Sequence, residues 1–430
     1  MTRRVEPLPI YPGSRALAAL PMLRRGLDGA GAVLCPHPGD QAAPALPEYT
    51  DLLDEPGLIL RTSGSTRPGK RAVIGFSALH ASARANQDRL GGPATWLLTL
   101  STQHVAGIMV LVRSLLAGTQ PVAMDNRDGF AVKAFAAAAA RLPGSGPFDT
   151  ALVPTQLRRI LDSPAGAAGL RRFRTVLVGG AATDQDLLQH AWGEGVHVIT
   201  TYGMSESGGG CVYDGVPLAG IRLDLGAARA PVTGRAVTTG GLSGRAGSGR
   251  PTGREEQPRR IRVAGPVLAA GYLGEPERTA RTFVTDRAGV RWLITDDVGW
   301  YDERGRLVVH GRLDDVVITG GIKVWPAIVE EALGHLLPLG AQAVVVGLPD
   351  PEWGEVVAAA VVLPPREVGP ALPQIRRLLR GGLPAPALPR VVAYLPELPQ
   401  LPSGKLDRER LRALLVGEWA KQRVEDGDSR

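Results

Sequence analysis

The chain has 430 residues, a length that predicts two or three domains. Hydrophobic residues make up 44% of it and charged residues 21%, a composition that excludes a mostly disordered protein. The 49 lysines and arginines exceed the 42 acidic residues, giving a net charge of +7, but they are scattered along the chain. This scatter favours a solvated basic surface over a nucleic-acid site.

The cysteine content and the hydropathy of the sequence indicate the cellular compartment of the protein. Cys35 and Cys211 stand alone in the sequence, so neither a disulfide framework nor a zinc site is expected. The N-terminus has no apolar core of signal-peptide length. The most apolar stretch, residues 105–117, is interrupted by Arg113 and is shorter than the roughly 20 residues of a membrane-spanning helix. We expect a cytoplasmic protein without an integral membrane span.

Apolar runs of strand length alternate with helix-length segments through the first half of the chain. The predicted elements are, in chain order, strand 96–100, helix 104–117, strand 120–124, helix 130–141, and strands 150–154, 175–178 and 196–200. Because these strands are apolar on both faces, they predict parallel sheets covered by helices on both sides, which is an α/β fold.

The second half of the chain begins with a break in this pattern. Residues 227–260 are rich in glycine, arginine, serine and threonine, and predict a flexible surface insertion. Antiparallel strands are expected at 260–263 and 306–310. The elements after residue 315 suit a small second domain of α+β type: helix 326–336, strands 341–346 and 356–363, helix 372–380 and strand 391–394.

A loop of small and hydroxyl-bearing residues follows the short apolar run 58–60. It reads Thr-Ser-Gly-Ser-Thr-Arg-Pro-Gly-Lys over residues 62–70. Small residues allow backbone N–H groups to surround phosphate oxygens, and the lysine adds a positive charge. The loop lacks the Gly-Lys-Ser/Thr ending of a P-loop. On its own it indicates either a phosphate-binding loop or an ordinary turn.

Two further motifs lie at the ends of predicted strands. Thr-Thr-Tyr-Gly-Met-Ser-Glu spans residues 200–206, and Val-Gly-Gly-Ala-Ala spans residues 178–182. Ligands bind at the carboxyl ends of parallel strands. At such a place Glu206 could hold Mg²⁺ against phosphates, and Tyr202 could stack on a base. Each motif alone is equally consistent with an ordinary loop.

The remaining motifs are weak when taken singly. They are Leu-Ile-Thr-Asp-Asp-Val-Gly at 293–299, Gly-Arg-Leu-Asp-Asp at 311–315, Thr-Gly-Gly-Ile-Lys-Val-Trp-Pro at 319–326 and Leu-Pro-Ser-Gly-Lys-Leu-Asp at 401–407. An acidic residue after a strand can bind both hydroxyls of a ribose, and a lysine on a glycine-containing turn can reach into a site. Both patterns are also common in solvated loops.

Together and in this order, the motifs resemble those of the adenylate-forming superfamily of acyl-CoA synthetases, peptide-synthetase adenylation domains and luciferases. The resemblance covers residues 58–411. It implies a large N-terminal ATP- and acyl-binding domain, residues 1–313, and a small mobile C-terminal domain, residues 314–430, that carries the catalytic lysine. ATP, Mg²⁺ and coenzyme A are the cofactors that it implies.

The same resemblance assigns roles to individual residues. The implied ATP-binding residues are Thr62, Ser63, Gly64, Ser65, Thr66, Lys70, Gly180, Ala181, Thr201, Tyr202, Gly203, Asp297 and Arg312. Of these, Gly180, Ala181 and Tyr202 would surround the adenine, and Asp297 would bind the ribose. The other implied roles are catalysis for Lys405 and Glu206, metal binding for Glu206, the hinge for Asp314, and the coenzyme A tunnel for Gly320 and Gly321.

Three positions depart from the usual pattern of the superfamily. Arg67 and Asp296 stand where glycine is usual, and Gly69 stands where proline is usual. The part of the chain before the phosphate loop is also short for the superfamily, which indicates one of its compact members. We expect ATP to bind despite these departures.

Residues 101–118 narrow the choice within the superfamily. They resemble the corresponding segment of the o-succinylbenzoate–CoA ligases of menaquinone biosynthesis, and residues 201–211 are similar to that subgroup too. This implies that His104 is catalytic and lines the acyl pocket, that Arg113 faces the second carboxylate of the substrate, and that Ser207 and Gly208 contact the substrate. A guanidinium in an apolar helix needs an anion or another hydrogen-bonding partner. A structural pairing of Arg113 and a core position for His104 stay open.

The expected activity is ATP-dependent ligation of a small-molecule carboxylic acid to coenzyme A. Two alternatives stay open. One is the same chemistry on an aryl, medium-chain or amino acid, with coenzyme A or a carrier-protein thiol as acceptor. The other is a catalytically silent nucleotide-binding homologue. No nucleic-acid partner is expected, and a homo-oligomer is compatible with the sequence.

Overall fold

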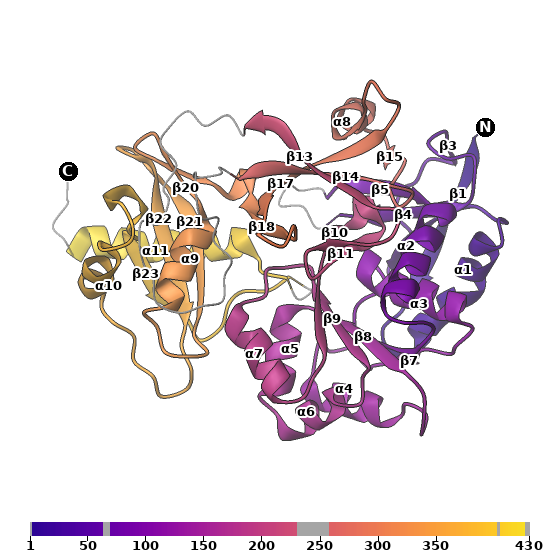
Figure 1. The fold of residues 1–430 in the computed structure, drawn as a ribbon, viewed down its shortest axis with the longest axis horizontal. Helices are drawn as coiled ribbons and strands as arrows, with labels where there is room; N and C mark the ends of the chain where they lie inside the picture. The colour runs from indigo at the N-terminus through magenta and orange to yellow at the C-terminus, as the bar shows by residue number, and fades with distance from the viewer. Residues whose placement is uncertain (1, 63–68, 230–257, 402–404, 426–430) are drawn as a thin grey trace. The chain divides into compact units, whose positions relative to one another are not determined.

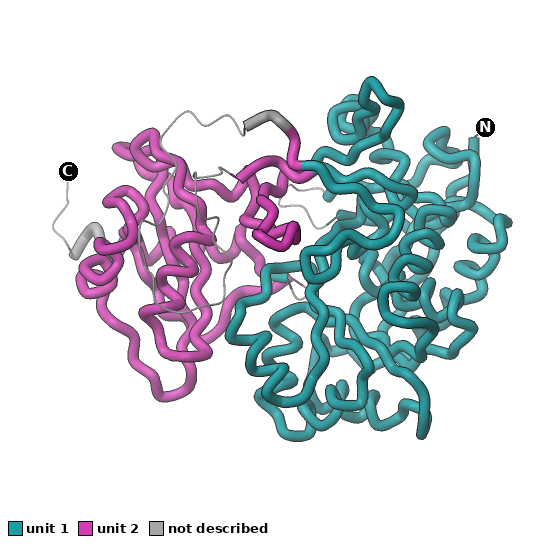
Figure 2. The backbone as a smooth tube through the Cα atoms, in the orientation of Figure 1, with its two compact units in different colours: residues 1–224, 262–294, 402–405 teal, residues 225–261, 295–401, 406–430 magenta. Residues whose placement is uncertain are grey.

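The computed structural model describes residues 2–62, 69–229, 258–401 and 405–425. Residues 63–68 of the expected phosphate loop, which include Ser63, Gly64, Ser65, Thr66 and Arg67, lie outside the described residues, as does most of the predicted insertion. The chain forms two compact units (Figure 2). Unit 1 comprises residues 1–224, 262–294 and 402–405, and unit 2 comprises residues 225–261, 295–401 and 406–430.

Unit 1 contains a six-stranded sheet that includes the strands on either side of the phosphate loop. Its strands, in sheet order, are β15 (Gly271–Tyr272), β5 (Arg71–Gly75), β4 (Gly57–Arg61), β2 (Val33–Pro38), β1 (Arg3–Ile10) and β3 (Tyr49–Thr50). Strands β1, β2 and β4 are parallel, and the others are antiparallel to their neighbours. The N–H of Thr62 donates to the carbonyl of Lys70 over 2.8 Å. The expected phosphate loop therefore leaves and re-enters the sheet at one point.

A seven-stranded sheet forms the other half of unit 1. Its strands, in sheet order, are β12 (Val216–Pro217), β11 (Gly209–Tyr213), β10 (Val198–Met204), β9 (Thr175–Gly179), β8 (Phe148–Leu152), β6 (Thr95–Leu98) and β7 (Val122–Ala123). The five strands from β10 to β7 are parallel, whereas β11 and β12 are antiparallel additions at one edge. The predicted parallel sheet and its strands are confirmed.

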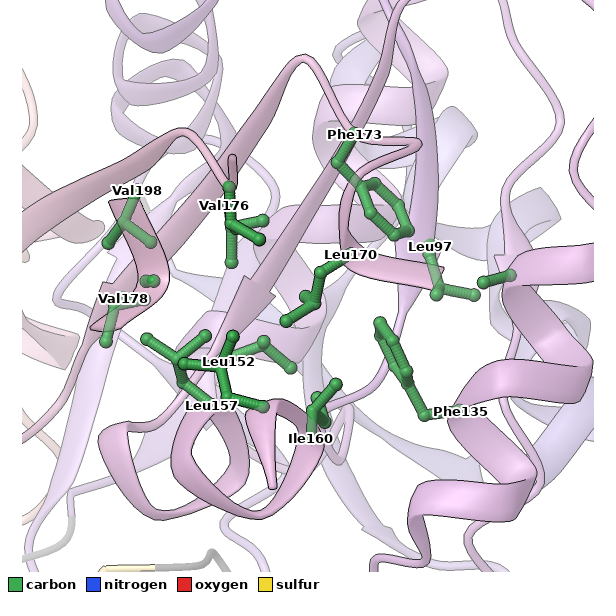
Figure 3. Packing of buried hydrophobic residues seen from close by; sticks show 14 of the residues in the cluster. Leu97, Phe135, Leu152, Leu157, Ile160, Leu170, Phe173, Val176, Val178 and Val198 are labelled. Carbon is green, nitrogen blue, oxygen red and sulfur yellow. The ribbon is translucent and has the colours of Figure 1, made fainter. Parts of the chain in front are cut away.

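Helices cover both faces of the seven-stranded sheet (Figure 1). The helices of unit 1 are α1 (Leu20–Leu27), α2 (Phe76–Arg89), α3 (Val105–Ala117), α4 (Val132–Ala140), α5 (Pro154–Leu161), α6 (Pro164–Leu170), α7 (Gln185–Gly193) and α8 (Pro276–Thr282). On one face, α4 to α7 bury a cluster in which Phe135 and Leu170 pack near Leu97 (Figure 3). Trp96 precedes Leu97 and points to the opposite face, where it contacts Arg113 of α3.

The strands of a third sheet contain residues of both units. Its strands are β13 (Arg222–Arg229), β14 (Arg259–Ala264), β17 (Arg291–Tyr301) and β16 (Phe283–Thr285), with β18 (Leu307–Arg312) paired to β17. The predicted strands near 260 and 306 are confirmed. The predicted insertion was too long at both ends, because β13 continues to Arg229 and β14 already begins at Arg259.

Unit 2 contains a five-stranded sheet with helices on both faces. Its strands are β20 (Ile322–Val324), β19 (Val317–Thr319), β22 (Gly354–Val362), β21 (Gln342–Asp350) and β23 (Val391–Tyr394), and its helices are α9 (Pro326–Gly334), α10 (Leu372–Leu379) and α11 (Arg408–Glu425). Alternate residues of β22 belong to different cores. Val357 and Ala359 pack with α9 and α10, whereas Ala358 and Ala360 pack with α11. The predicted α+β elements are confirmed.

The packing boundary between the units lies within β17, between Ile294 and Thr295. This boundary lies upstream of the domain limit expected at residues 313 and 314. The hinge expected at Asp314 concerns motion rather than packing and stays a prediction. In the part of the chain that the structure describes, none of the helices combines the length and the apolar character that crossing a membrane requires.

An aromatic cluster in unit 2 buries one histidine. The ring centre of His310 lies 5.0 Å from that of Trp300 and 5.1 Å from that of Trp325. Burial lowers the pKa of His310 to about 4. The folded protein therefore keeps this imidazole neutral at a pH where the unfolded chain, with a histidine pKa of about 6.5, already binds a proton.

The stability of the protein should consequently fall as the pH drops from 6.5 towards 4. Between pH 7.5 and pH 4 the wild type should lose about 3 kcal/mol more free energy of unfolding than His310→Leu, since each pKa unit corresponds to about 1.4 kcal/mol. Urea unfolding of both proteins at both pH values, followed by tryptophan fluorescence, measures this difference. Equal losses in the two proteins would contradict the prediction.

Candidate active site

Two neighbouring parallel strands of unit 1 end side by side. Thr201 of β10 lies opposite the last residue of β9, so Gly180 and Ala181, which follow β9, reach the same end of the sheet as Tyr202 and Gly203 of β10. Gly180 and Ala181 are exposed, and the φ of Gly180 is +82°, a left-handed conformation that favours glycine. The structure thus brings together the residues expected around the adenine, at the place where α/β folds bind ligands.

The segment between β10 and β11 turns tightly. A Cβ on Gly203 would collide with the carbonyl of Gly209, so this position requires glycine. Ser207 is fully buried, and its hydroxyl donates to the Gly209 carbonyl over 2.9 Å and accepts from the Met204 N–H over 3.0 Å. Gly208 has a φ of +63°. Ser207 and Gly208 therefore shape the loop, with the Ser207 donor committed to backbone. Their contact with substrate stays a prediction.

Glu206 lies in this loop with 7% of its surface exposed. The hydroxyl of Tyr272 in β15 donates a hydrogen bond to Oε1 of Glu206 over 2.8 Å. Burial raises the pKa of Tyr272, and the nearby Glu206 charge raises it further, so the tyrosine stays a neutral donor. Nζ of Lys70 lies 5.7 Å from the centre of the Tyr272 ring. The expected metal ligand and the expected phosphate-binding lysine thus meet at one tyrosine.

The carboxylate of Glu206 has the properties of a magnesium ligand. It is buried, and no lysine or arginine of the described ranges forms a salt bridge with it, which leaves a buried negative charge for a cation. The described residues contain no group of three or more Asp, Glu, His or Cys side chains that could hold a metal by themselves. Mg²⁺ commonly binds one or two carboxylates together with substrate phosphates. A single carboxylate therefore fits an ion that arrives with ATP.

His104 directly precedes α3 and lies near two positively charged side chains. Burial lowers its pKa below the usual 6.5, and the charges of Lys405 and Arg61 lower it further, so the imidazole is neutral at neutral pH. A Cβ on Gly180 would lie 3.2 Å from Cε of Lys405. Residue 405 packs with unit 1. Lys405 therefore lies at the strand ends that carry Gly180, and its charge acts on His104.

Arg113 lies on α3 nine residues after His104, about 13 Å further along the helix axis. Only 6% of its surface is exposed. Its guanidinium lies 5.0 Å from the centre of the Trp96 ring, and Nη2 donates to the hydroxyl of Tyr213 over 3.4 Å. Arg113 is therefore held apart from His104, and its buried Nε donor has no acceptor among the described residues.

The surroundings of Arg113 are polar as well as aromatic. Asn86 donates a hydrogen bond of 2.7 Å to the same Tyr213 hydroxyl. A small cavity beside Arg113 is lined in part by Asn86 and Asp149. Asp149 is itself paired with Arg174 over 2.5 Å, so its charge is already balanced. That Arg113 faces the second carboxylate of the substrate stays a prediction. The structural pairing of Arg113, which the sequence left open, is present as its hydrogen bond to Tyr213.

In unit 2, one arginine connects three carboxylates. Arg312 hydrogen-bonds to Asp297 over 3.1 Å and to Asp314 over 2.8 Å, and it forms a salt bridge of 3.7 Å with Asp296. Burial by itself lowers the pKa of Arg312. The hydrogen bond to Asp314 and the charges of the surrounding carboxylates outweigh this effect, so the pKa is raised. The residues expected to bind ribose, bind nucleotide and form the hinge are thus one network. Asp296, unusual at its position, adds a charge to that network.

Gly320 and Gly321 form the turn between β19 and β20. Their φ values are +56° and +76°, and a two-residue hairpin turn of this kind favours glycine at both positions. A Cβ on Gly320 would lie 2.8 Å from the ring of Trp353. Turn geometry and this close approach account for the glycines. The coenzyme A tunnel stays a prediction.

Comparison with known proteins identifies the family. Residues 32–273, more than half of the chain, match the AMP-binding enzyme family. The chain is an AMP-binding enzyme. Residues 329–405 of this AMP-binding enzyme match the AMP-binding enzyme C-terminal domain.

Three individual proteins illustrate the relationship. A "Probable 2-succinylbenzoate--CoA ligase" of Mycobacterium tuberculosis is 37% identical to this AMP-binding enzyme over 94% of the chain and 97% of the relative. A fatty acid–[acyl-carrier-protein] ligase of Streptomyces coeruleorubidus is 31% identical over 86% of the chain and 69% of the relative. ATP-bound MatB from Rhodopseudomonas palustris has a TM-score of 0.73 at 21% identity, covering 97% of this chain and 90% of that chain, which establishes the shared fold.

Several residues of these sites were not predicted from the sequence. Tyr272 lies 66 residues from Glu206, and Tyr213 lies 100 residues from Arg113, so no local pattern connects either pair. Arg61 is different, because it ends the apolar run immediately before the phosphate loop. A charged residue at that position is a signal that the sequence does contain.

Proposed function

We propose that this AMP-binding enzyme joins o-succinylbenzoate to coenzyme A through an acyl-adenylate, the ligation step of menaquinone biosynthesis. The observation that carries the proposal is the position of Lys405 against Gly180, at the carboxyl ends of the parallel strands, with its charge acting on His104. The relative from M. tuberculosis, 37% identical along nearly its whole length, supports o-succinylbenzoate as the acid. ATP and coenzyme A are cytoplasmic metabolites, and we place the activity in the cytoplasm.

In the first step, an oxygen of the succinyl carboxylate attacks the α-phosphorus of ATP. The bond between this phosphorus and the bridging oxygen to the β-phosphate breaks, and pyrophosphate leaves. No protein nucleophile is needed, because the step depends on positioning and on neutralising charge. Lys405 would neutralise the α-phosphate and Lys70 the departing phosphates. The neutral His104 would donate an N–H to the reacting carboxylate and leave its negative charge intact.

One residue of the described chain, Glu206, has the properties needed to bind magnesium in this scheme. Glu206 would hold the ion, which when bound supplies positive charge to the phosphate oxygens of ATP.

In the second step, the thiolate of coenzyme A attacks the carbonyl carbon of the adenylate, and AMP leaves. The C-terminal part would rotate about Asp314, withdraw Lys405 and bring Gly320 and Gly321 alongside the pantetheine. Such rotations separate successive steps in many enzymes. The hydrogen bonds from Arg312 to Asp314 would link this hinge to the nucleotide-binding residues.

The substrate is a dicarboxylate, and only one of its carboxylates reacts. We propose Arg113 as the group that attracts the other one. The buried Nε of this guanidinium has no hydrogen-bond partner in the described part of the chain, which supports this role, because a buried donor without an acceptor is costly and a carboxylate would satisfy it.

Release of pyrophosphate from ATP tests the proposal. The purified protein is incubated with ATP and each acid of a panel, with and without coenzyme A, and the products are identified by mass spectrometry. Release with o-succinylbenzoate, together with its coenzyme A thioester, is the expected result. Release only with another acid, or transfer only to a carrier protein, would keep the adenylation chemistry and overturn the substrate. No release with any acid would favour a silent nucleotide-binding homologue.

A further inference from the structure

Tyr272 makes contacts with both halves of the proposed phosphate site. Its hydroxyl donates to Oε1 of Glu206 over 2.8 Å, and its ring lies below Nζ of Lys70 at 5.7 Å. Only 3% of Tyr272 and 7% of Glu206 is exposed, so water does not compete freely for this hydrogen bond. No lysine or arginine of the described ranges forms a salt bridge with Glu206, so the Tyr272 hydroxyl is a specific restraint on this carboxylate.

The backbone of Tyr272 is fixed from several sides. Strand β15 pairs with β5, placing Tyr272 opposite Ala72, two residues after Lys70. The Tyr272 N–H donates to the hydroxyl of Thr279 over 2.9 Å. The N–H of Ala269, three residues earlier, donates to the carbonyl of Glu206 over 2.9 Å. The same short segment thus anchors both the backbone and the side chain of Glu206.

Packing also fixes the ring. The ring centres of Tyr272 and Phe283 lie 5.9 Å apart. A phenol held at its ring and its backbone can move its oxygen very little, so the Oε1 atom that it binds is fixed as well. The second oxygen of Glu206, Oε2, is the one without a hydrogen bond to Tyr272.

We propose that Tyr272 is a positioning residue for the metal site. Its hydrogen bond to Oε1 of Glu206 fixes the carboxylate and leaves Oε2 as the oxygen that would bind the Mg²⁺ accompanying ATP. This inference rests on the proposed function, in which Glu206 holds that ion. Mg²⁺ demands nearly ideal octahedral geometry, and a ligand fixed by an outer hydrogen bond meets that demand with less loss of freedom. The ring position under Lys70 makes the same residue a link to the lysine that would bind the phosphates.

The test compares ATP binding with and without the metal. Isothermal titration calorimetry, run without any acid so that no reaction occurs, gives the Kd of ATP in saturating Mg²⁺ and in EDTA. The Kd in EDTA divided by the Kd in Mg²⁺ measures what the metal contributes to ATP binding. Tyr272→Phe removes the hydroxyl and keeps the ring, and it should lower this ratio about 10-fold, the lower end of the loss caused by removing an outer hydrogen bond to a metal ligand. The Kd in EDTA should stay unchanged.

Two further variants make the test selective. Tyr394→Phe is the matched control, since that hydroxyl also donates one hydrogen bond, to the Pro370 carbonyl over 2.7 Å, and it should change neither constant. Glu206→Gln should lower the ratio, and adding Tyr272→Phe to it should have no further effect, because the hydroxyl acts on the metal site through the carboxylate.

The outcomes separate the inference from the proposed function. If Glu206→Gln lowers the ratio and Tyr272→Phe does not, the positioning role of Tyr272 is overturned and the metal site stands. If Tyr272→Phe weakens ATP binding equally in Mg²⁺ and in EDTA, the tyrosine is merely structural and the inference is again overturned. If Glu206→Gln leaves the ratio unchanged, the metal role of Glu206 fails, and the inference fails with it.

Discussion

Replacing Lys405 with alanine should lower the rate of acyl-adenylate formation by about 10²- to 10³-fold, the usual cost of removing one group that stabilises developing charge. The aliphatic part of this side chain lies against Gly180, at the strand edge that carries the expected adenine site. The same lysine is close enough to His104 to lower the pKa of that imidazole. A positive charge at this place would act on the α-phosphate and the reacting carboxylate together.

The second half-reaction separates a catalytic role of Lys405 from a structural one. Thioester formation from supplied acyl-adenylate and coenzyme A should proceed at close to the wild-type rate in Lys405→Ala. Lys421→Ala is a suitable control, because Lys421 forms a surface ion pair of 2.7 Å with Glu418, and such pairs contribute little. Single-turnover measurements of each half-reaction give both rates. An equal loss in the two half-reactions would refute the role given to Lys405.

The architecture of the site could be predicted because its parts are local in sequence. Strand β9 is a short apolar run followed directly by Gly180 and Ala181, and β10 begins with apolar residues and contains Tyr202 and Gly203 near its end. Parallel pairing then places the segment at Gly180 beside Thr201 of β10 without any information about distant contacts. Motif order and hydrophobic pattern were therefore enough to predict that these residues lie together.

The features that the sequence did not predict are strands of unusual composition and side-chain contacts between distant segments. Strand β1 contains Pro7 and Pro9, which the pattern of an ordinary strand does not favour, yet both lie in its pairing register with β2. The partner of Glu206 comes from β15, a strand of two residues whose position follows from its pairing with β5. The environment of Arg113 is equally non-local, because Trp96 and Tyr213 come from two different strands.

Arg113 is the residue for which sequence and structure favour different roles, and a second mutation decides between them. Replacing Arg113 with methionine keeps the apolar stem over Trp96 and removes all the donors. If the guanidinium attracts the second carboxylate, kcat/KM for o-succinylbenzoate should fall about 100-fold, within the range measured when one member of a buried charge pair is removed. The KM for ATP should stay within about twofold of the wild-type value.

The matched control is a change in the substrate. The acid 4-oxo-4-phenylbutyrate keeps the reacting succinyl carboxylate and lacks the one on the ring, so wild type and Arg113→Met should use it with similar kcat/KM. The preference for the dicarboxylate would then be lost in the variant and partly kept in Arg113→Lys, which retains the charge without the planar group of donors. A parallel fall with both acids and a higher KM for ATP would instead make Arg113 a structural partner of Tyr213 and Trp96. In that case the donor for the second carboxylate must be sought nearer to His104, where Arg61 supplies a positive charge.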